Sequence, residues 1–181
     1  MGRALAAAAI AAGHQVVIVS GPVEVAYPDE AEVIPVVSTE EMLAASAGIF
    51  PSCDGLIGVA APCDYRPVHV EANKISKTGQ PLRLELIETD DIVATLGAGK
   101  TSQWLVGFAL ETEDRRLRAL AKLEKKHCDL MVLNGATAMN ALDNEVEIID
   151  PAGQVIEAIS GPKDEVARRI FAVIQARLID R

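Results

Sequence analysis

An acidic, an aromatic and a basic residue stand side by side directly after an apolar segment. The apolar segment, residues 56–61, is predicted to be a buried strand because its side chains do not alternate in polarity. Asp64, Tyr65 and Arg66 then follow Pro62 at the carboxyl end of that strand. Ligands of open parallel α/β sheets bind at this edge, so the triplet indicates a binding site. Asp64 could hold a metal ion or a ligand hydroxyl, or it could stabilise a turn through an Asx interaction.

Three lysines could bind an anionic ligand. Lys74 lies in a basic loop without apolar periodicity and could reach a phosphate or a developing negative charge, or it could stay in solvent. Lys122 and Lys126 are four residues apart on a predicted helix, where like charges cost roughly 0.2–0.5 kcal/mol unless an anion bridges them. The alternative is that both simply favour the negative end of the helix dipole.

Two further segments place side chains at strand and helix ends. Asp90 and Asp91 begin a predicted helix, where carboxylates favour the dipole and the free backbone N–H groups can bind an anion. Phe108 lies in a buried strand over residues 104–109 and could stack on a nucleobase or pack in the core.

The sequence lacks the complete patterns of several known phosphate, dinucleotide and metal sites. Residues 97–101 resemble a phosphate-binding P-loop, but the pattern needs a glycine where Ala94 stands, and the segment follows a helix instead of opening one. We therefore predict a surface turn there. The sequence contains no G-x-G-x-x-G fingerprint, which disfavours a dinucleotide-dependent oxidoreductase. The three histidines have no spacing for a metal site or a catalytic triad, and the metal ligands stay unknown.

The elements that must position these residues alternate between helix and strand. We predict helices over residues 2–12, 39–50, 89–96, 113–126 and 162–178, and strands over 15–20, 32–37, 56–61, 82–87, 104–109, 130–133, 145–149 and 155–159. The last two strands form a β-hairpin. The predicted fold is α/β: a single domain over residues 1–181, a Rossmann-like three-layer sandwich with a mainly parallel sheet and a C-terminal β-hairpin. A helix before the first parallel-type strand implies an unfilled sheet position that needs covering.

Composition narrows the classes of function. Half of the residues are hydrophobic and few are aromatic, as in helices packed on a parallel sheet. The net charge of −9 argues against nucleic-acid and anionic-membrane partners. Three cysteines without metal spacing are expected to be reduced thiols, and with no signal peptide or spanning segment we expect a cytoplasmic protein.

Taken in order, the motifs resemble a known family. They are Gly-His-x-Val-x-Ile-Val-Ser-Gly-Pro-Val from residue 13, Ala-Ala-x-x-Asp-Tyr-Arg-Pro from residue 60, Lys-Ile-x-Lys from residue 74, Asp-Ile-Val-Ala from residue 91, Val-Gly-Phe-Ala-x-Glu-Thr from residue 106, and the late lysine pair. This series resembles the bacterial phosphopantothenoylcysteine synthetases, ligases of coenzyme A biosynthesis, over essentially the whole chain.

The resemblance implies a CTP-dependent ligase that joins 4′-phosphopantothenate to cysteine through an acyl-cytidylate, with Mg²⁺, in a homodimer to which the hairpin at residues 145–159 contributes. Lys74 would be catalytic and would also bind the triphosphate. The remaining nucleotide-site residues implied by the resemblance are Ala60, Asp64, Asp90, Asp91, Ile92, Val93, Phe108, Lys122 and Lys126.

The sequence also departs from the family pattern. The family has a strand and a loop ahead of the position of Met1, Asp90 stands where a proline is usual, and Asn134-Gly135 stands where Asn-Asp is usual. We therefore expect reduced stability unless a partner fills the sheet. The alternative to the ligase is a non-catalytic nucleotide-binding or dimerising remnant of the same fold.

Overall fold

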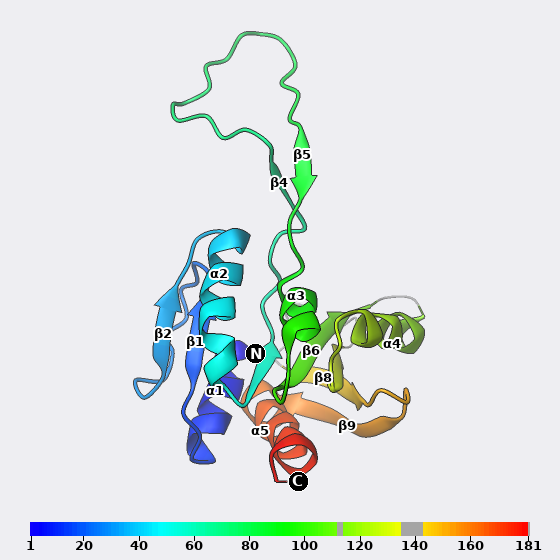
Figure 1. The fold of residues 1–181 in the computed structure, drawn as a ribbon. Coiled ribbons are helices and arrows are strands. Elements are labelled where there is room, and N and C mark those ends of the chain that lie inside the picture. Colours follow the sequence, from blue (N-terminus) through cyan, green and yellow to red (C-terminus); the bar gives the residue numbers. More distant parts are fainter. Residues whose placement is uncertain (112–113, 135–142, 181) are drawn as a thin grey trace.

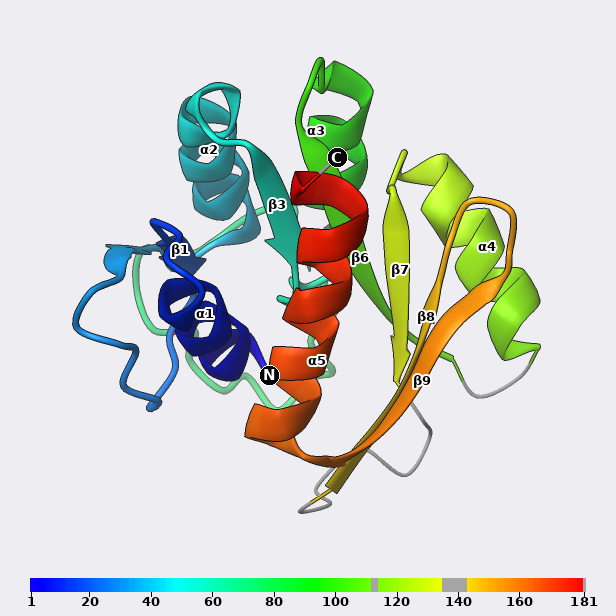
Figure 2. The ribbon, with the colours of Figure 1, turned by 90° about the horizontal axis from the view of Figure 1, so that it is seen from below.

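The structure, a computed structural model, describes residues 1–111, 114–134 and 143–180, and for residue 143 the backbone only. Its centre is a five-stranded sheet in the order β3-β6-β7-β8-β9 (Figures 1 and 2). The predicted first residue of one helix, Glu113, and Gly135, which stands where the family pattern has Asp, lie outside the described residues.

The central sheet is parallel on one side and antiparallel on the other. The parallel strands are β3 (Gly55–Gly58), β6 (Trp104–Leu110) and β7 (Leu130–Asn134). The hairpin of β8 (Asp143–Ile149) and β9 (Val155–Pro162) adds to β7 in antiparallel register. The prediction of a mainly parallel sheet with a C-terminal hairpin is confirmed.

Helices cover both faces of this sheet. On one face lie α1 (Gly2–Ala11) and α5 (Lys163–Ile174), which continues as a π-helical turn, Gln175–Ile179. On the other lie α2 (Thr39–Ile49) with its following 3₁₀ turn Phe50–Ser52, α3 (Ile92–Gly99) and α4 (Arg115–Lys125). This is the predicted three-layer arrangement.

The side chains of the buried strands point alternately to the two faces of the sheet and form a hydrophobic core on each face. Val106 and Val132 pack with α1 and α5, whereas Leu105, Met131 and Leu133 pack with α3 and α4. Successive side chains of a strand point to opposite faces, so an uninterrupted apolar run serves both layers at once.

A second, two-stranded parallel sheet lies beside the first. It consists of β1 (Val17–Ser20) and β2 (Glu32–Pro35), and it is not hydrogen-bonded to β3 in the part of the chain described. Both β1 and β3 therefore have one edge without a strand partner among the described residues, which agrees with the predicted unfilled sheet position.

The prediction of one strand over residues 82–87 is wrong in its place and extent. The strand is β5 (Leu86–Glu88), and it pairs in antiparallel register with β4 (Tyr65–Pro67), a strand that the sequence analysis missed. With the connecting residues 68–85 they form an arm, defined here as residues 65–88, that extends away from the central sheet (Figure 1). We expected one face of this strand to be buried. Both strands are instead exposed on both faces.

The prediction of reduced cysteines agrees with the structure. The three cysteines Cys53, Cys63 and Cys128 are free thiols. Within the described ranges, none of the helices is long and apolar enough to cross a membrane.

Candidate functional site

A cavity opens at the carboxyl ends of β3 and β6, between the N-terminus of α3 and the root of the arm. Its volume is about 120 Å³, below the roughly 300–1,000 Å³ of most ligand pockets, so a nucleotide would fill it and extend beyond its mouth. The lining residues come from four segments of the chain: Gly58, Ala60, Pro62, Cys63, Asp64, Thr89, Asp90, Asp91, Ile92, Val93, Gly107, Phe108 and Lys126.

Two paired glycines lie where the cavity begins: Gly58 at the end of β3 and Gly107 within β6. A Cβ atom on Gly58 would lie 2.7 Å from a methyl carbon of Val93, so a side chain at this position would require Val93 in the first turn of α3 to shift. Gly107 and Phe108 on the neighbouring strand also line the cavity, and the Phe108 side chain packs against the core on the face of α1 and α5.

Asp91 connects the first turn of α3 to the last turn of α4. Its Oδ1 accepts a hydrogen bond from the backbone N–H of Ala94 at 3.1 Å, which caps the helix, and its Oδ2 lies 3.1 Å from Nζ of Lys126. Burial alone would raise the pKa of the Asp91 carboxyl, but the Ala94 hydrogen bond and the Lys126 ammonium together outweigh burial and lower the pKa. The carboxyl therefore stays ionised and fixes the Lys126 ammonium at the cavity.

The end of α4 is held in place by a glycine in α3. A Cβ atom on Gly97 would lie 2.1 Å from the carbonyl oxygen of Lys126, which means that the helices meet backbone to backbone. The prediction of a surface turn over residues 97–101 is therefore wrong for Gly97, which is buried in α3, although the segment forms no phosphate loop. The absence of a side chain at Gly97 lets the end of α4 approach α3, which places Lys126 next to Asp91.

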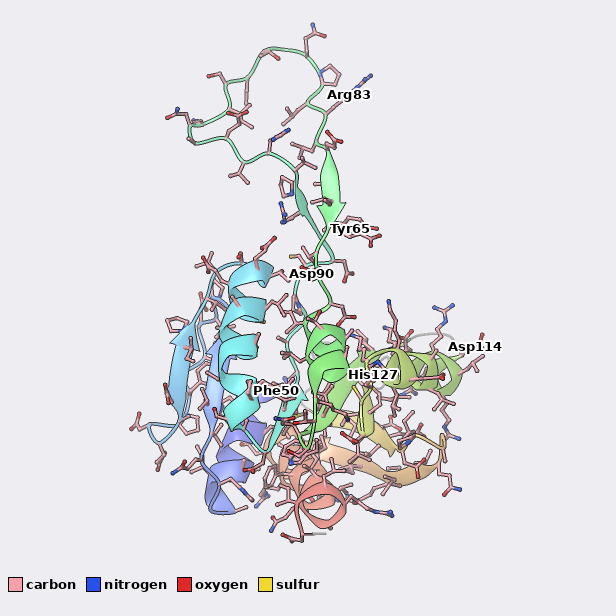
Figure 3. All side chains as sticks on the ribbon, in the orientation of Figure 1. Phe50, Tyr65, Arg83, Asp90, Asp114 and His127 are labelled. Atoms are coloured by element: carbon pink, nitrogen blue, oxygen red, sulfur yellow. The ribbon has the colours of Figure 1, made fainter. Side chains whose placement is uncertain are left out.

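The root of the arm closes another side of the cavity. The backbone N–H of Thr89 donates to the carbonyl of Asp64 at 2.9 Å, and the Thr89 hydroxyl donates to the carbonyl of Cys63 at 2.5 Å. Figure 3 shows Asp90 where the arm joins the central part of the molecule, with Tyr65 and Arg83 farther out. These hydrogen bonds join the two chain segments at the root of the arm, both of which line the cavity.

The structure brings together all the predicted nucleotide-site residues except two lysines. Those in the cavity lining are Ala60, Asp64, Asp90, Asp91, Ile92, Val93, Phe108 and Lys126. Lys74 lies in the exposed arm and outside the lining. Lys122 lies outside it too, with its Nζ 2.5 Å from Oε1 of the buried Glu111 in an ion pair that is not aligned as a hydrogen bond. The assignment of ligand roles to these residues stays a prediction.

The sequence analysis missed the lining residues that contribute backbone or small side chains. Gly58, Gly107, Cys63 and Thr89 carry no charge or aromatic ring, and a search for chemically active side chains passes over them. Their positions in the sequence could have indicated them, because each is at most two residues from a predicted site residue.

Among the described residues, no three His, Cys, Asp or Glu side chains form a group that could hold a metal ion. The acidic residues at the cavity, Asp64, Asp90 and Asp91, could supply one or two carboxylates to a Mg²⁺ ion, the number with which this ion is usually held beside substrate phosphates. A Mg²⁺ ion would thus be bound mainly by the ligand that carries it.

Residues 1–178 match the family model described as the DNA/pantothenate metabolism flavoprotein C-terminal domain. The chain belongs to this family. It is 42% identical over 142 residues to the coenzyme A biosynthesis bifunctional protein CoaBC of Bacillus subtilis, covering 78% of this chain and 35% of that protein. It is 38% identical over 180 residues to a cysteine/cysteine sulfinic acid decarboxylase of an unknown prokaryotic organism, covering 96% of this chain and 50% of that protein. The chain thus spans half or less of the length of these relatives.

Solved structures show the same fold. The crystal structure of the C-terminal domain of a CoaBC protein superimposes with a TM-score of 0.82 at 34% identity, covering 99% of this chain and 84% of that one. A mutant of Cab2 in complex with phosphopantothenate-cysteine superimposes with a TM-score of 0.64 at 16% identity, covering 84% of this chain and 54% of that one, and this likeness concerns the fold alone. The chain is therefore a domain of the coenzyme A biosynthesis family, related to phosphopantothenoylcysteine synthetases.

Proposed function

We propose that this domain joins 4′-phosphopantothenate to cysteine at the expense of CTP, with an acyl-cytidylate as intermediate. The observation that carries the proposal is the convergence of Asp64, the segment 90–93, Phe108 and Lys126 on one cavity at the carboxyl edge of the sheet. The complex of the Cab2 mutant with phosphopantothenate-cysteine supports the substrate class.

In the first step, a carboxylate oxygen of phosphopantothenate forms a bond to the α-phosphorus of CTP, and pyrophosphate leaves with the bridging oxygen. In the second step, the amine of cysteine attacks the acyl carbon, CMP leaves with the anhydride oxygen that bridged carbon and phosphorus, and the amine loses a proton as the amide forms. Such phosphoryl chemistry depends chiefly on positioning and on compensating negative charge.

The residues of the cavity fit those needs. Phe108 lines the cavity and is the residue to which we assign contact with the base, while the N-terminus of α3 and the Lys126 ammonium offer positive charge for phosphate oxygens. A Mg²⁺ ion bound to the triphosphate would neutralise further charge, with Asp90 or Asp64 as its carboxylate ligand. The preference for CTP over ATP is part of the proposal and comes from the family resemblance.

Lys122 could join the triphosphate site by leaving Glu111. Its side chain is about half exposed whereas that of Glu111 is buried, so the lysine is the partner that can move. Lys74 could act on the anhydride only if residues 68–85 fold back over the cavity or if the arm of another copy supplies it.

Because Lys74 and Lys122 lie outside the cavity lining, a second candidate is a domain that binds the nucleotide without catalysing its reaction. The two candidates are separated by measuring pyrophosphate release with 4′-phosphopantothenate and Mg²⁺, comparing CTP with ATP. Release with CTP alone is the result expected of the ligase. CTP binding by calorimetry without pyrophosphate release would establish the second candidate. The absence of both CTP binding and pyrophosphate release would refute both candidates.

Variants connect the result to the cavity. Lys126→Gln should weaken CTP binding, while Arg177→Gln removes the same charge from the exposed last turn of the C-terminal helix, outside the lining, and should change nothing. Lys74→Gln should lower kcat and leave CTP affinity almost unchanged. Equal effects of Lys126→Gln and Arg177→Gln would mean that only net charge matters.

A further inference from the structure

A second cavity lies at the C-terminal end of α3, whereas the first lies at its N-terminal end. Its volume is about 530 Å³, within the roughly 300–1,000 Å³ of most small-molecule sites. The lining residues come from α4 and the turn after it, from the end of α3 and from the turn of the β8–β9 hairpin: Lys100, Leu120, Leu123, Glu124, His127, Cys128 and Pro151. None of them lines the first cavity, and the proposed ligase reaction uses none of them.

Much of this lining is apolar. Leu123 and Cys128 are buried in the core beside α4. Leu120 lies against the hairpin turn, because a Cβ atom on Gly153 would lie 3.4 Å from one of its methyl carbons. Burial raises the pKa of the Cys128 thiol to about 11, so the thiol stays uncharged near neutral pH. Together with Pro151, these residues offer a surface for a hydrocarbon group.

Lys100 places a fixed ammonium at this cavity. Its Nζ donates a hydrogen bond to Oδ2 of Asp129 at 2.7 Å, and the same oxygen accepts from the backbone N–H of Leu105 at 2.7 Å. The lysine side chain is only 20% exposed, so the contact holds it in one position. An ammonium has three N–H groups, and the contacts among the described residues use one of them. The others are available to a carboxylate.

Glu124 contributes the opposite charge to the same cavity. Its side chain is exposed, and none of the ion pairs between described residues includes it. An ionised carboxylate accepts hydrogen bonds and pairs with an ammonium group. The cavity is therefore complementary to a ligand that carries one negative and one positive group.

His127 lies in the lining with a strained backbone. Its φ is 52°, in the left-handed region that costs a side-chain-bearing residue energy. It directly follows Lys126, the last residue of the α4 cap, where glycine is usual for this reason. Strained residues are concentrated at ligand sites, and a ring N–H of histidine can donate to a carboxylate. We therefore assign the imidazole to the same ligand group as Lys100.

We propose that the second cavity binds a free amino acid with an apolar side chain. The α-carboxylate of the ligand binds Lys100 and His127, its ammonium group binds Glu124, and its side chain packs on the apolar part of the lining. An apolar amino acid unites these three features, whereas a simple acid or a simple amine has only two of them. The site is separate from the first cavity, and the proposal does not depend on the ligase reaction.

Three related probes test the proposal. They are L-phenylalanine, hydrocinnamate, which lacks its amine, and phenethylamine, which lacks its carboxylate. In nitrogen–proton NMR titrations of the whole chain, L-phenylalanine should cause saturable shifts at residues 120–128 and 150–153 with a Kd of about 1 mM or lower. Each analogue should bind roughly 3- to 10-fold more weakly, because one charged contact is lost.

Two variants assign the charged contacts. Lys100→Gln should lower the affinity for L-phenylalanine to that for phenethylamine, and it should leave phenethylamine binding unchanged. Glu124→Gln should lower it to the affinity for hydrocinnamate without weakening the binding of hydrocinnamate. Lys125→Gln is the matched control, because it removes an exposed charge of α4 outside the lining and should change none of the three affinities.

His127→Gly separates binding from folding. Glycine adopts the left-handed backbone without strain, so this variant should not lower the thermal unfolding midpoint. It should nevertheless bind L-phenylalanine roughly 3-fold more weakly, because the imidazole is lost. Binding at the wild-type affinity would overturn the role of His127.

The other contrary outcomes concern the cavity itself. No saturable shift with any of the three probes overturns the proposal. Shifts centred on residues 91–93 and 107–108 overturn it as well, because the probes would then bind in the first cavity. Equal affinities for the three probes would overturn the choice of an amino acid as the ligand.

Discussion

The central sheet and the arm use the same kind of residue in opposite surroundings. Leu105 on β6 is 0% exposed, whereas Leu84 before β5 is 63% exposed. The difference is coverage, because helices lie on both faces of the sheet and none lies on the arm (Figure 1). An apolar strand is thus stabilised by burial within the chain where helices cover it, and keeps its side chains in solvent where they do not.

The largest expected effect is the contrast between these two leucines. Leu105→Ala leaves a cavity in the core and should lower the free energy of unfolding by about 2–5 kcal/mol. Leu84→Ala should lower it by less than about 0.5 kcal/mol in dilute, monomeric protein. Urea unfolding followed by the fluorescence of Trp104, the only tryptophan, measures both. Similar losses would show that the arm packs within its own chain.

Two glycines of α3 allow a similar comparison between a packed and an open position next to the central sheet. Gly97→Ala forces a methyl group against the Lys126 carbonyl and should destabilise the protein by about 1–3 kcal/mol, more than alanine gains in helix propensity. Gly99→Ala meets no atom within 4 Å and should be neutral or stabilising. Thermal unfolding of the two variants gives the answer, and a neutral Gly97→Ala would mean that α3 and α4 can separate without cost.

Asp91→Asn tests the ion pair at the cavity with a side chain that can still cap α3. Because the pKa of Asp91 is lowered in the folded protein, its stabilisation is fully present above its ordinary pKa of 3.8 and is lost as the pH falls through the lower folded value. The wild type should be more stable than the variant by no more than about 1 kcal/mol near neutral pH. That difference should vanish in acid, so a difference that is constant with pH would refute the ion-pair explanation.

The smallest effect is expected where the arm touches the central part through an ion pair between Arg66 and Glu40. Both side chains are about half exposed, so Arg66→Gln should leave the unfolding midpoint unchanged. The pair joins the arm to α2, however, so its loss should speed proteolytic cleavage within residues 68–85. Cleavage at the wild-type rate would show that the hydrogen bonds at Thr89 hold the arm by themselves.

Much of the fold was predictable because its signals are local. The uninterrupted apolar runs of β6 and β7 indicate strands covered on both sides, and the capping box of Ser38 and Glu41 marks the start of α2. The arm was not predictable, because the alternation of residues 82–87 is the same whether a sheet covers one face or both faces stay exposed.

The sequence by itself determined the alternation of helix and strand and the residue types at the strand ends. Those features follow from side-chain period, capping and turn chemistry within a few residues. Only the tertiary structure decided that Asp91 reaches Lys126, that Lys122 pairs with Glu111, and that Gly97 permits the contact between α3 and α4. Those contacts join residues far apart in the chain, and their geometry depends on how closely two backbones can approach, which no local pattern encodes.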